Sequence, residues 1–262
     1  MTTLLAPSVR ATLNFAANRN DGGRHCNTDD SKTFLELDPH EVTITDARGL
    51  ESAPRFDREG FVLADHPVAD PQWFDEDWID AVYAQTCNDL VKRLTGARET
   101  LQFHRPLKRI VDPDVRGEHM HTAGFVHVDH PREVGLQISE MFAGARGLGI
   151  KRGTLFNVWK AITPPPQDRP LTVADRRTVP TDAHVVGVTV DEGGDVPYVI
   201  MAHDERMKFY YFSNMTADES IVFTGIDFDA DNPLGCAHSA FLHPDSGVSR
   251  SSIESRVIAI YE

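Results

Sequence analysis

The chain has 262 residues, of which 40% are hydrophobic and 25% are charged, as is ordinary for a globular protein. Its formal net charge of −14 argues against nucleic acid or an anionic membrane surface as a partner, because both repel a negative protein. No stretch approaches the roughly 18 uninterrupted apolar residues of a membrane span.

The cysteines and the N-terminus indicate a reducing compartment. Cys26, Cys87 and Cys236 are odd in number and widely spaced, which favours free thiols over disulfides or a structural zinc site. The segment 1–7 lacks a basic region followed by an apolar run, so we expect no signal peptide and a cytoplasmic location. The oligomeric state stays open.

The first part of the chain predicts strands at 9–16, 42–48 and 60–66, with a polar, glycine-containing loop at 18–32. A helix is predicted from Pro71 to Gly96, because apolar residues recur at helical spacing, with acids in its first turn and bases in its last. We interpret its aromatic residues as core packing, not as a cofactor contact.

The rest of the chain predicts short strands and one further helix, at 132–145. The strands are expected at 99–105, 153–162, 196–201, 208–212, 219–225, 238–242 and 253–261. Residues 163–195 are rich in Pro, Asp and Arg, and we expect an irregular excursion there with one short helix. Without a βαβ rhythm or a linker, the pattern predicts one mainly β domain over 1–262, a barrel or sandwich with helical decoration. Its N-terminal strands and supporting helix occupy 1–98, and its core occupies 99–262.

The stretch 124–131 carries the strongest chemical signal. On a strand, His127 and Asp129 point to the same side and can supply two adjacent metal ligands. His238, on a later predicted strand, would complete the 2-His-1-carboxylate set of non-haem Fe(II) oxygenases. An isolated histidine is more often a hydrogen-bonded core residue, and His243-Pro244-Asp245 offers a second pair of the same kind.

Arg250 and Ser252 follow the last candidate ligand and lie on one face of a predicted strand. A guanidinium fork and a hydroxyl suit a buried carboxylate, such as the distal carboxylate of a 2-oxo acid that chelates iron at its other end. Arg256 lies on the same face and is the alternative anchor, although Glu254 is available to pair with it.

These segments together resemble the Fe(II)/2-oxoglutarate-dependent hydroxylase/desaturase family of secondary metabolism, which includes gibberellin desaturase and the cephamycin 7α-hydroxylase component. The resemblance runs through most of the chain: 42–48, 60–61, 95–97, 127–129, 157–160, 167–171, 215–219, 238–241 and 250–256. It implies a double-stranded β-helix (jelly-roll, cupin-like) core. It also implies Fe(II), 2-oxoglutarate and O₂ as cofactor and co-substrates, iron ligands His127, Asp129 and His238, and a 2-oxoglutarate anchor at Arg250 and Ser252.

The resemblance also implies the reaction. An Fe(IV)-oxo species would abstract hydrogen and lead to hydroxylation, desaturation or ring formation, with release of succinate and CO₂. Related halogenases replace the carboxylate ligand by a small residue, whereas this chain keeps Asp129. It departs from the family at His130-Pro131, Lys160 and Arg169, so we expect a substrate outside the well-known terpenoids and β-lactams.

The segment between Phe103 and Asp129 is rich in basic residues and leads into the metal motif, and it indicates the charge of the substrate. If part of it stands at the barrel mouth, it would attract a small polar or anionic metabolite, with Arg109 and His121 as contacts. Phe156 or Trp159, whichever faces inward, would supply an apolar wall. The alternative is that these bases are solvated loop charges.

The sequence is also compatible with two other classes of protein. A cupin-like metal-dependent hydrolase or isomerase would use the same three ligands but leave Arg250 and Ser252 without a partner. A non-catalytic binding barrel would need none of these residues for chemistry. Release of succinate and CO₂ from 2-oxoglutarate in the presence of Fe(II) distinguishes the oxygenase from both.

Overall fold

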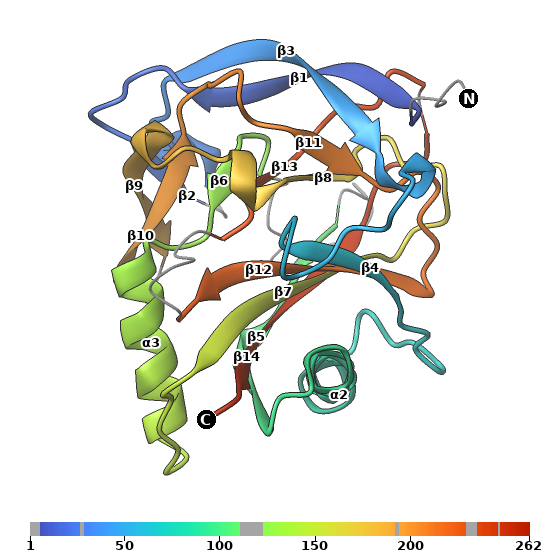
Figure 1. Ribbon diagram of the computed structural model, residues 1–262, viewed down its shortest axis with the longest axis vertical. Helices are drawn as coiled ribbons and strands as arrows, with labels where there is room; N and C mark the ends of the chain where they lie inside the picture. Colours follow the sequence, from blue (N-terminus) through green and yellow to red (C-terminus); the bar gives the residue numbers. More distant parts are fainter. Residues whose placement is uncertain (1–5, 27–28, 111–122, 192–193, 229–234, 246) are drawn as a thin grey trace.

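The computed structural model describes residues 6–26, 29–110, 123–191, 194–228, 235–245 and 247–262, and within them two sheets face each other (Figure 1). The strands are β1 (Ser8–Ala16), β2 (Arg24–Cys26), β3 (Leu37–Asp46), β4 (Phe61–Asp65), β5 (Glu99–Arg109), β6 (His127–Val128), β7 (Gly153–Ala161), β8 (Leu171–Ala174), β9 (His184–Asp191), β10 (Gly194–Met201), β11 (Phe209–Tyr211), β12 (Glu219–Asp227), β13 (His238–Ala240) and β14 (Ser252–Ile260). The larger sheet has the order β1-β3-β11-β8-β13-β6-β10-β9-β2, and the smaller β4-β12-β7-β14-β5. The mainly β class is therefore as predicted.

The smaller sheet is covered on both faces. On its inner face, Trp159 of β7 packs with Phe61 and Phe223 against residues of the larger sheet. On its outer face, Phe156 and Val158 pack with the helix that precedes β5. Because both faces are covered, all nine residues of β7 are buried, and this explains the continuous apolar run in its sequence.

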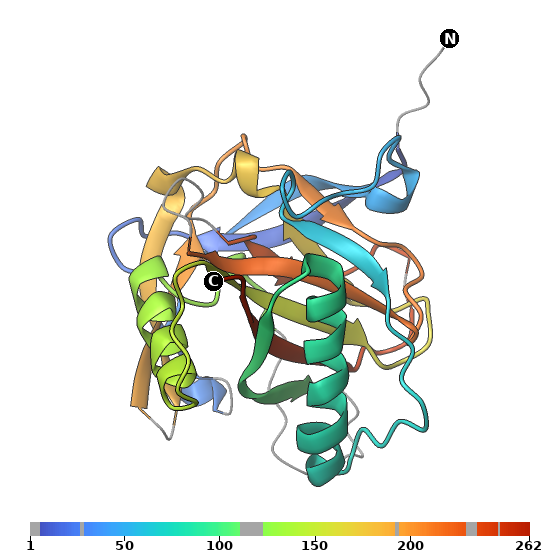
Figure 2. The same ribbon diagram turned by 60° about the horizontal axis from the view of Figure 1, so that its bottom comes forward.

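That helix consists of α1 (Glu76–Trp78), a π-helical turn η3 (Ile79–Tyr83) and α2 (Ala84–Thr95). It starts after the predicted Pro71, because the Asp75 side chain caps it by accepting a hydrogen bond from the backbone N–H of Trp78 at 3.0 Å. It ends as predicted, with Gly96 in the left-handed conformation at φ 68°. Figure 2 shows α2 lying along the outer face of the smaller sheet, with α3 (Arg132–Gly144) to its left.

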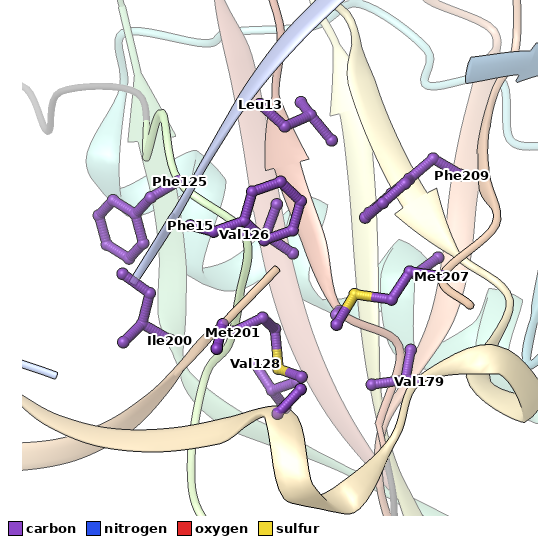
Figure 3. Close-up of a cluster of buried hydrophobic side chains, with 14 of the residues drawn as sticks. Leu13, Phe15, Phe125, Val126, Val128, Val179, Ile200, Met201, Met207 and Phe209 are labelled. Atoms are coloured by element: carbon purple, nitrogen blue, oxygen red, sulfur yellow. The ribbon is translucent and has the colours of Figure 1, made fainter. Parts of the chain in front are cut away.

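The larger sheet curls back on itself around an apolar cluster (Figure 3). The N–H of Val126 donates to the carbonyl of Asn14 at 2.9 Å, which brings the segment before β6 against β1. Phe15 of β1, fully buried, lies in this cluster with Met201 and Phe209. This packing fixes the position of β6, and therefore of the residues that begin at His127.

Two predicted segments differ from the structure. Residues 163–195 hold the strands β8 and β9, together with the short turns η4 (Arg176–Thr178) and η5 (Thr181–Ala183), where an irregular excursion was expected. β8 has only four residues, all buried between β11 and β13, so neighbouring strands and not local propensity determine it. The predicted polar loop at 18–32 likewise contains β2, which pairs with β9. None of the helices in the described ranges combines the length and apolar character needed to cross a membrane.

Candidate active site

The three predicted ligands converge between the sheets. His127 of β6 and His238 of β13 are directly paired in the antiparallel ladder, and their ring centroids are 4.3 Å apart. Asp129 follows β6, with its Oδ1 3.9 Å from Nε2 of His127. One potential ligand atom from each residue lies within 4.8 Å of the other two, the one such group of three His, Cys, Asp or Glu side chains in the described part of the chain.

Both histidines have their outer nitrogen engaged by the backbone. Nδ1 of His127 is 2.9 Å from the carbonyl oxygen of Phe125, and Nδ1 of His238 is 3.1 Å from that of Cys236. Because a carbonyl only accepts, each Nδ1 carries the proton and each Nε2 keeps its lone pair. This arrangement, in which the outer N–H is held and the inner nitrogen is available, is typical of metal-binding histidines.

The Asp129 carboxylate is held at both oxygens by the smaller sheet. Nη2 of Arg256 donates to Oδ1 at 2.7 Å, and Nδ2 of Asn157 donates to Oδ2 at 2.7 Å. Glu254 accepts from the same two residues, from Nε of Arg256 at 3.2 Å and from Nδ2 of Asn157 at 3.2 Å. Asp129 is therefore fixed by residues on β7 and β14, opposite the strands that carry the histidines.

The electrostatics keep these groups in metal-binding forms. Burial, and next the neighbouring His238, lower the pKa of His127 to about 3, so its imidazole is neutral. Burial alone would raise the pKa of Asp129, but the Arg256 guanidinium and the two histidines outweigh it and hold that pKa well below its usual range. A neutral imidazole at His127 and an ionised carboxylate at Asp129 are donors that fit a divalent iron ion.

Arg250 lies beside this group, 1% exposed, and Ser252 is equally buried. Nε of Arg250 has no hydrogen-bond partner among the described residues. Burial, and then the positive charge of Arg109, lower the pKa of Arg250 to about 9. A buried cation with an unused donor and a cationic neighbour is a site that favours a bound carboxylate.

The alternative anchor, Arg256, is engaged elsewhere. Its guanidinium binds Asp129 and Glu254, and the latter pairing agrees with the partner expected from the sequence. A small cavity of about 20 Å³ lies instead among Arg250, Arg109 and the two histidines; its lining residues are Arg109, Ala123, His127, Leu171, His238, Ser239, Ala240, Arg250 and Glu254. This cavity is smaller than a dicarboxylate, so a dicarboxylate could bind there only if the side chains that line the cavity changed rotamer.

The basic segment divides between two faces of β5. Arg105 and Lys108 point outward and pair with helix acids, Arg105 with Asp80 at 2.8 Å and Lys108 with Glu76. Arg109 pairs in register with Ser252 and faces the cavity. His121, the other predicted contact, lies outside the described residues. Arg109 is thus the basic residue of β5 that reaches the site.

Of the two aromatic candidates, Trp159 faces inward and Phe156 does not. The Trp159 ring lies under the Arg250 guanidinium, with 5.3 Å between Cζ and the ring centroid. Phe156 packs against Phe56 on the outer face, with 4.8 Å between ring centroids. Phe156 also lines a hollow of about 840 Å³ there, which is larger than the cavity at the histidines but contains none of the three ligands.

The sequence did not indicate that Asn157 contacts the site, and it indicated Glu254 only as a partner for Arg256. Asn157 is a polar residue between the apolar Phe156 and Val158, on the same strand face as Trp159. Glu254 lies on the same strand face as Ser252. A polar side chain at an inward position of a buried strand was the available signal.

Comparison with known proteins gives the class. The hydroxylase/desaturase efuI of Hormonema carpetanum is 29% identical over 289 aligned positions, covering 98% of this chain and 96% of efuI. The Fe(II)/2-oxoglutarate-dependent dioxygenase nvfI of Aspergillus novofumigatus is 28% identical, covering 84% and 83%. A solved structure of the iron and alpha-ketoglutarate-dependent endoperoxidase NvfI superimposes with a TM-score of 0.81 at 25% identity over 97% of each chain. The fold is therefore the jelly-roll of these oxygenases.

A family model described as "Oxidoreductase/YMDC permease-like domain" matches residues 13–260. The chain belongs to this oxidoreductase family and, with these relatives, to the Fe(II)/2-oxoglutarate-dependent hydroxylases and desaturases of secondary metabolism. It is accordingly an enzyme that uses Fe(II), 2-oxoglutarate and O₂ on a small-molecule substrate. The resemblance seen in the sequence is confirmed, and the two alternative classes are not favoured.

Proposed function

We propose that this oxygenase hydroxylates or desaturates a small polar or anionic metabolite, with His127, Asp129 and His238 as the iron ligands. The observation that carries the proposal is the convergence of these three donors, within 4.8 Å of one another, beside the buried cation Arg250. When bound, the iron supplies, with 2-oxoglutarate and O₂, the oxidising chemistry that removes hydrogen from a C–H bond.

The residues of the chain bind and orient the reactants. Arg250 and Ser252 hold the distal carboxylate of 2-oxoglutarate, because Arg250 lines the cavity with charged donors and the buried Ser252, two residues further along the chain, offers a hydroxyl. The Trp159 ring covers one face of the guanidinium, so the N–H edge is directed to the co-substrate. The fixed tautomers of His127 and His238 keep Nε2 toward the metal without rearrangement.

The substrate approaches from the side of Arg109. This residue lines the cavity from β5 and is partly buried, which lowers its pKa while leaving it a cation. A carboxylate or phosphate on the substrate would be attracted to Arg109 and oriented by it. Of the two aromatic residues, the inward-facing Trp159 is the candidate for the apolar wall.

The test is to mix the protein with Fe(II), 2-oxoglutarate and O₂ and to measure succinate and CO₂. The expected result is slow conversion without substrate, accelerated when a library of small acidic metabolites is added. No succinate from the parent under any of these conditions would refute the proposed function. Asp129→Ala is the matched negative control, because it removes one donor from the metal site.

A further inference from the structure

Asn157 connects two carboxylates of the site through its side-chain amide. It is fully buried on the inner face of β7, and its Nδ2 donates to Oδ2 of Asp129 at 2.7 Å and to Oε1 of Glu254 at 3.2 Å. Because both carboxylates only accept hydrogen bonds, the NH₂ group and not the carbonyl of Asn157 must face them. The orientation of the amide is therefore fixed by chemistry.

The two oxygens of Asp129 are consequently in different situations. Oδ1 is 3.9 Å from Nε2 of His127 and receives a hydrogen bond from Arg256. Oδ2 is the oxygen that Asn157 holds. We propose that Asn157 is a positioning residue that keeps Oδ2 away from the metal, so that Asp129 gives a single donor oxygen. The proposal rests on the proposed function, since it assumes that Asp129 binds the metal.

The difference between one and two donor oxygens matters for the co-substrate. A carboxylate can bind a metal through one oxygen or through both. A second oxygen would occupy a position that the three-ligand set leaves open for co-substrate and O₂. By holding Oδ2, Asn157 would keep that coordination position of the metal open, so that 2-oxoglutarate could bind there.

The opposite end of the amide shows how Asn157 is kept in place. Its Oδ1 is buried and has no hydrogen-bond partner among the described residues. It faces Gly225, at an irregularity in the pairing of β12 with β7, where an added Cβ would lie 2.7 Å from Oδ1. Gly225 therefore leaves the room that the amide needs, and the amide can turn toward the carboxylates.

Asn88 provides a matched control. It is also buried, its Nδ2 also donates twice, to the carbonyl of Ala84 at 2.8 Å and to Gln102 at 3.3 Å, and its Oδ1 also lacks a partner among the described residues. It lies on α2, outside the metal site. A purely structural effect of losing a buried asparagine should appear in both variants.

The experiment compares the parent with Asn157→Leu and Asn88→Leu, and uses Mn(II) as a metal that binds without turnover. Three quantities are measured: the affinity for Mn(II), the exchangeable water on protein-bound Mn(II) from solvent proton relaxation, and the affinity of Mn(II)-loaded protein for 2-oxoglutarate. Asn157→Ala and Gly225→Ala follow the same scheme and stand in if Asn157→Leu does not fold.

For Asn157→Leu we expect Mn(II) affinity equal to or tighter than that of the parent, less exchangeable water, and 2-oxoglutarate affinity lower by about tenfold or more, within the range of effects of residues behind metal ligands. Asn88→Leu should match the parent in all three. Unchanged 2-oxoglutarate affinity in Asn157→Leu, or weaker Mn(II) binding with unchanged water, would overturn the positioning role. A parent protein that binds no Mn(II), or binds it equally after Asp129→Ala, would instead refute the proposed metal site.

Discussion

The guanidinium of Arg250 lies over the indole ring of Trp159, with its Cζ 5.3 Å from the ring centroid. Such a contact fixes the plane of the guanidinium and leaves its N–H edges as the groups that can bind an anion. Arg250 lies two residues before the start of β14, and β14 is paired with β7, the strand that carries Trp159. The contact therefore limits the orientations that the Arg250 guanidinium can adopt.

Replacing Arg250 by Lys should therefore weaken co-substrate binding and leave the fold intact. Lysine keeps the charge but loses the planar fork and the stacked contact, so we expect the KM for 2-oxoglutarate to rise about tenfold or more with a smaller change in kcat. The measurement is steady-state kinetics with 2-oxoglutarate varied. Arg169→Lys, at a more exposed arginine, is the control. An unaltered KM in Arg250→Lys would move the anchor to Arg256.

Asp129→Ala should abolish turnover without unfolding the protein. The variant leaves Arg256 paired with Glu254, so no buried cation loses its last partner, and we expect a melting temperature close to that of the parent. Asp245→Ala removes the carboxylate of the other His-x-Asp pair, which lies in an exposed loop, and should keep full activity. Activity in Asp129→Ala, or its loss in Asp245→Ala, would contradict the assignment of the ligands.

Gly225→Ala should affect the site indirectly, by displacing the side chain of Asn157. The new Cβ would lie 2.7 Å from Oδ1 of Asn157 and 3.2 Å from the carbonyl oxygen of Leu155, so either the amide or the strand must shift. We expect a loss of 2-oxoglutarate affinity in the same direction as in Asn157→Leu. Gly144→Ala, where an added Cβ meets nothing within 4 Å, should bind as the parent does. Equal affinities in the two alanine variants would show that Gly225 is not needed for the amide.

The convergence of the three candidate ligands could be anticipated from the sequence because much of it depends on local pattern. Alternation on a strand places His127 and Asp129 together, and a single later histidine in a β segment, His238, completes the set. The same period of two is the basis on which Arg250 and Ser252 are proposed together as the anchor. What could not be predicted were contacts between the sheets, such as Asn157 with Asp129, because they depend on how two distant strands face each other.

In the fold as well, features set by local sequence pattern were predicted, and features set by contacts between distant strands were not. Most of the long strands and the helix end at Gly96 were predicted within a few residues, since their patterns are strong, but the eight-residue strand β9 was not. The strand β8 was missed because four residues carry too little pattern, and it exists through pairing with β11 and β13. The inward position of Trp159 over Phe156 was left open, because a strand buried on both faces shows no polar alternation.

Acid should destabilise the protein partly through His66, which lies outside the metal site. Burial, and next the positive charge of Lys160, lower its pKa to about 3, from an ordinary value of 6.5. Between these values the unfolded chain binds a proton at His66 that the folded chain does not, so stability is complete above pH 6.5 and falls as the pH drops toward 3. This residue alone contributes a slope of up to about 1.4 kcal/mol per pH unit.

The check is urea unfolding between pH 7 and about pH 4.5 in the parent and in His66→Gln. Glutamine can still bond Ser220, whose hydroxyl is 2.9 Å from Nδ1 of His66, but it does not titrate. We expect the free energy of unfolding to fall less steeply with acid in the variant. Parallel pH profiles for the two proteins would mean that other buried histidines carry the effect.

The last prediction concerns the charge of the substrate. Arg109 lies at the cavity near the proposed co-substrate anchor, whereas Arg105 on the same strand points outward and pairs with Asp80 and Glu76. If the substrate is anionic, Arg109→Ala should lower kcat/KM by about tenfold or more, and Arg105→Ala should leave it nearly unchanged. Raising the ionic strength should lower kcat/KM in the parent and have less effect in Arg109→Ala, because salt screens the attraction that the variant has already lost. His121→Ala, assayed alongside, tests the second contact predicted from the sequence. Equal values for the parent, Arg109→Ala and His121→Ala at both salt concentrations would show that the substrate is recognised without a cationic contact.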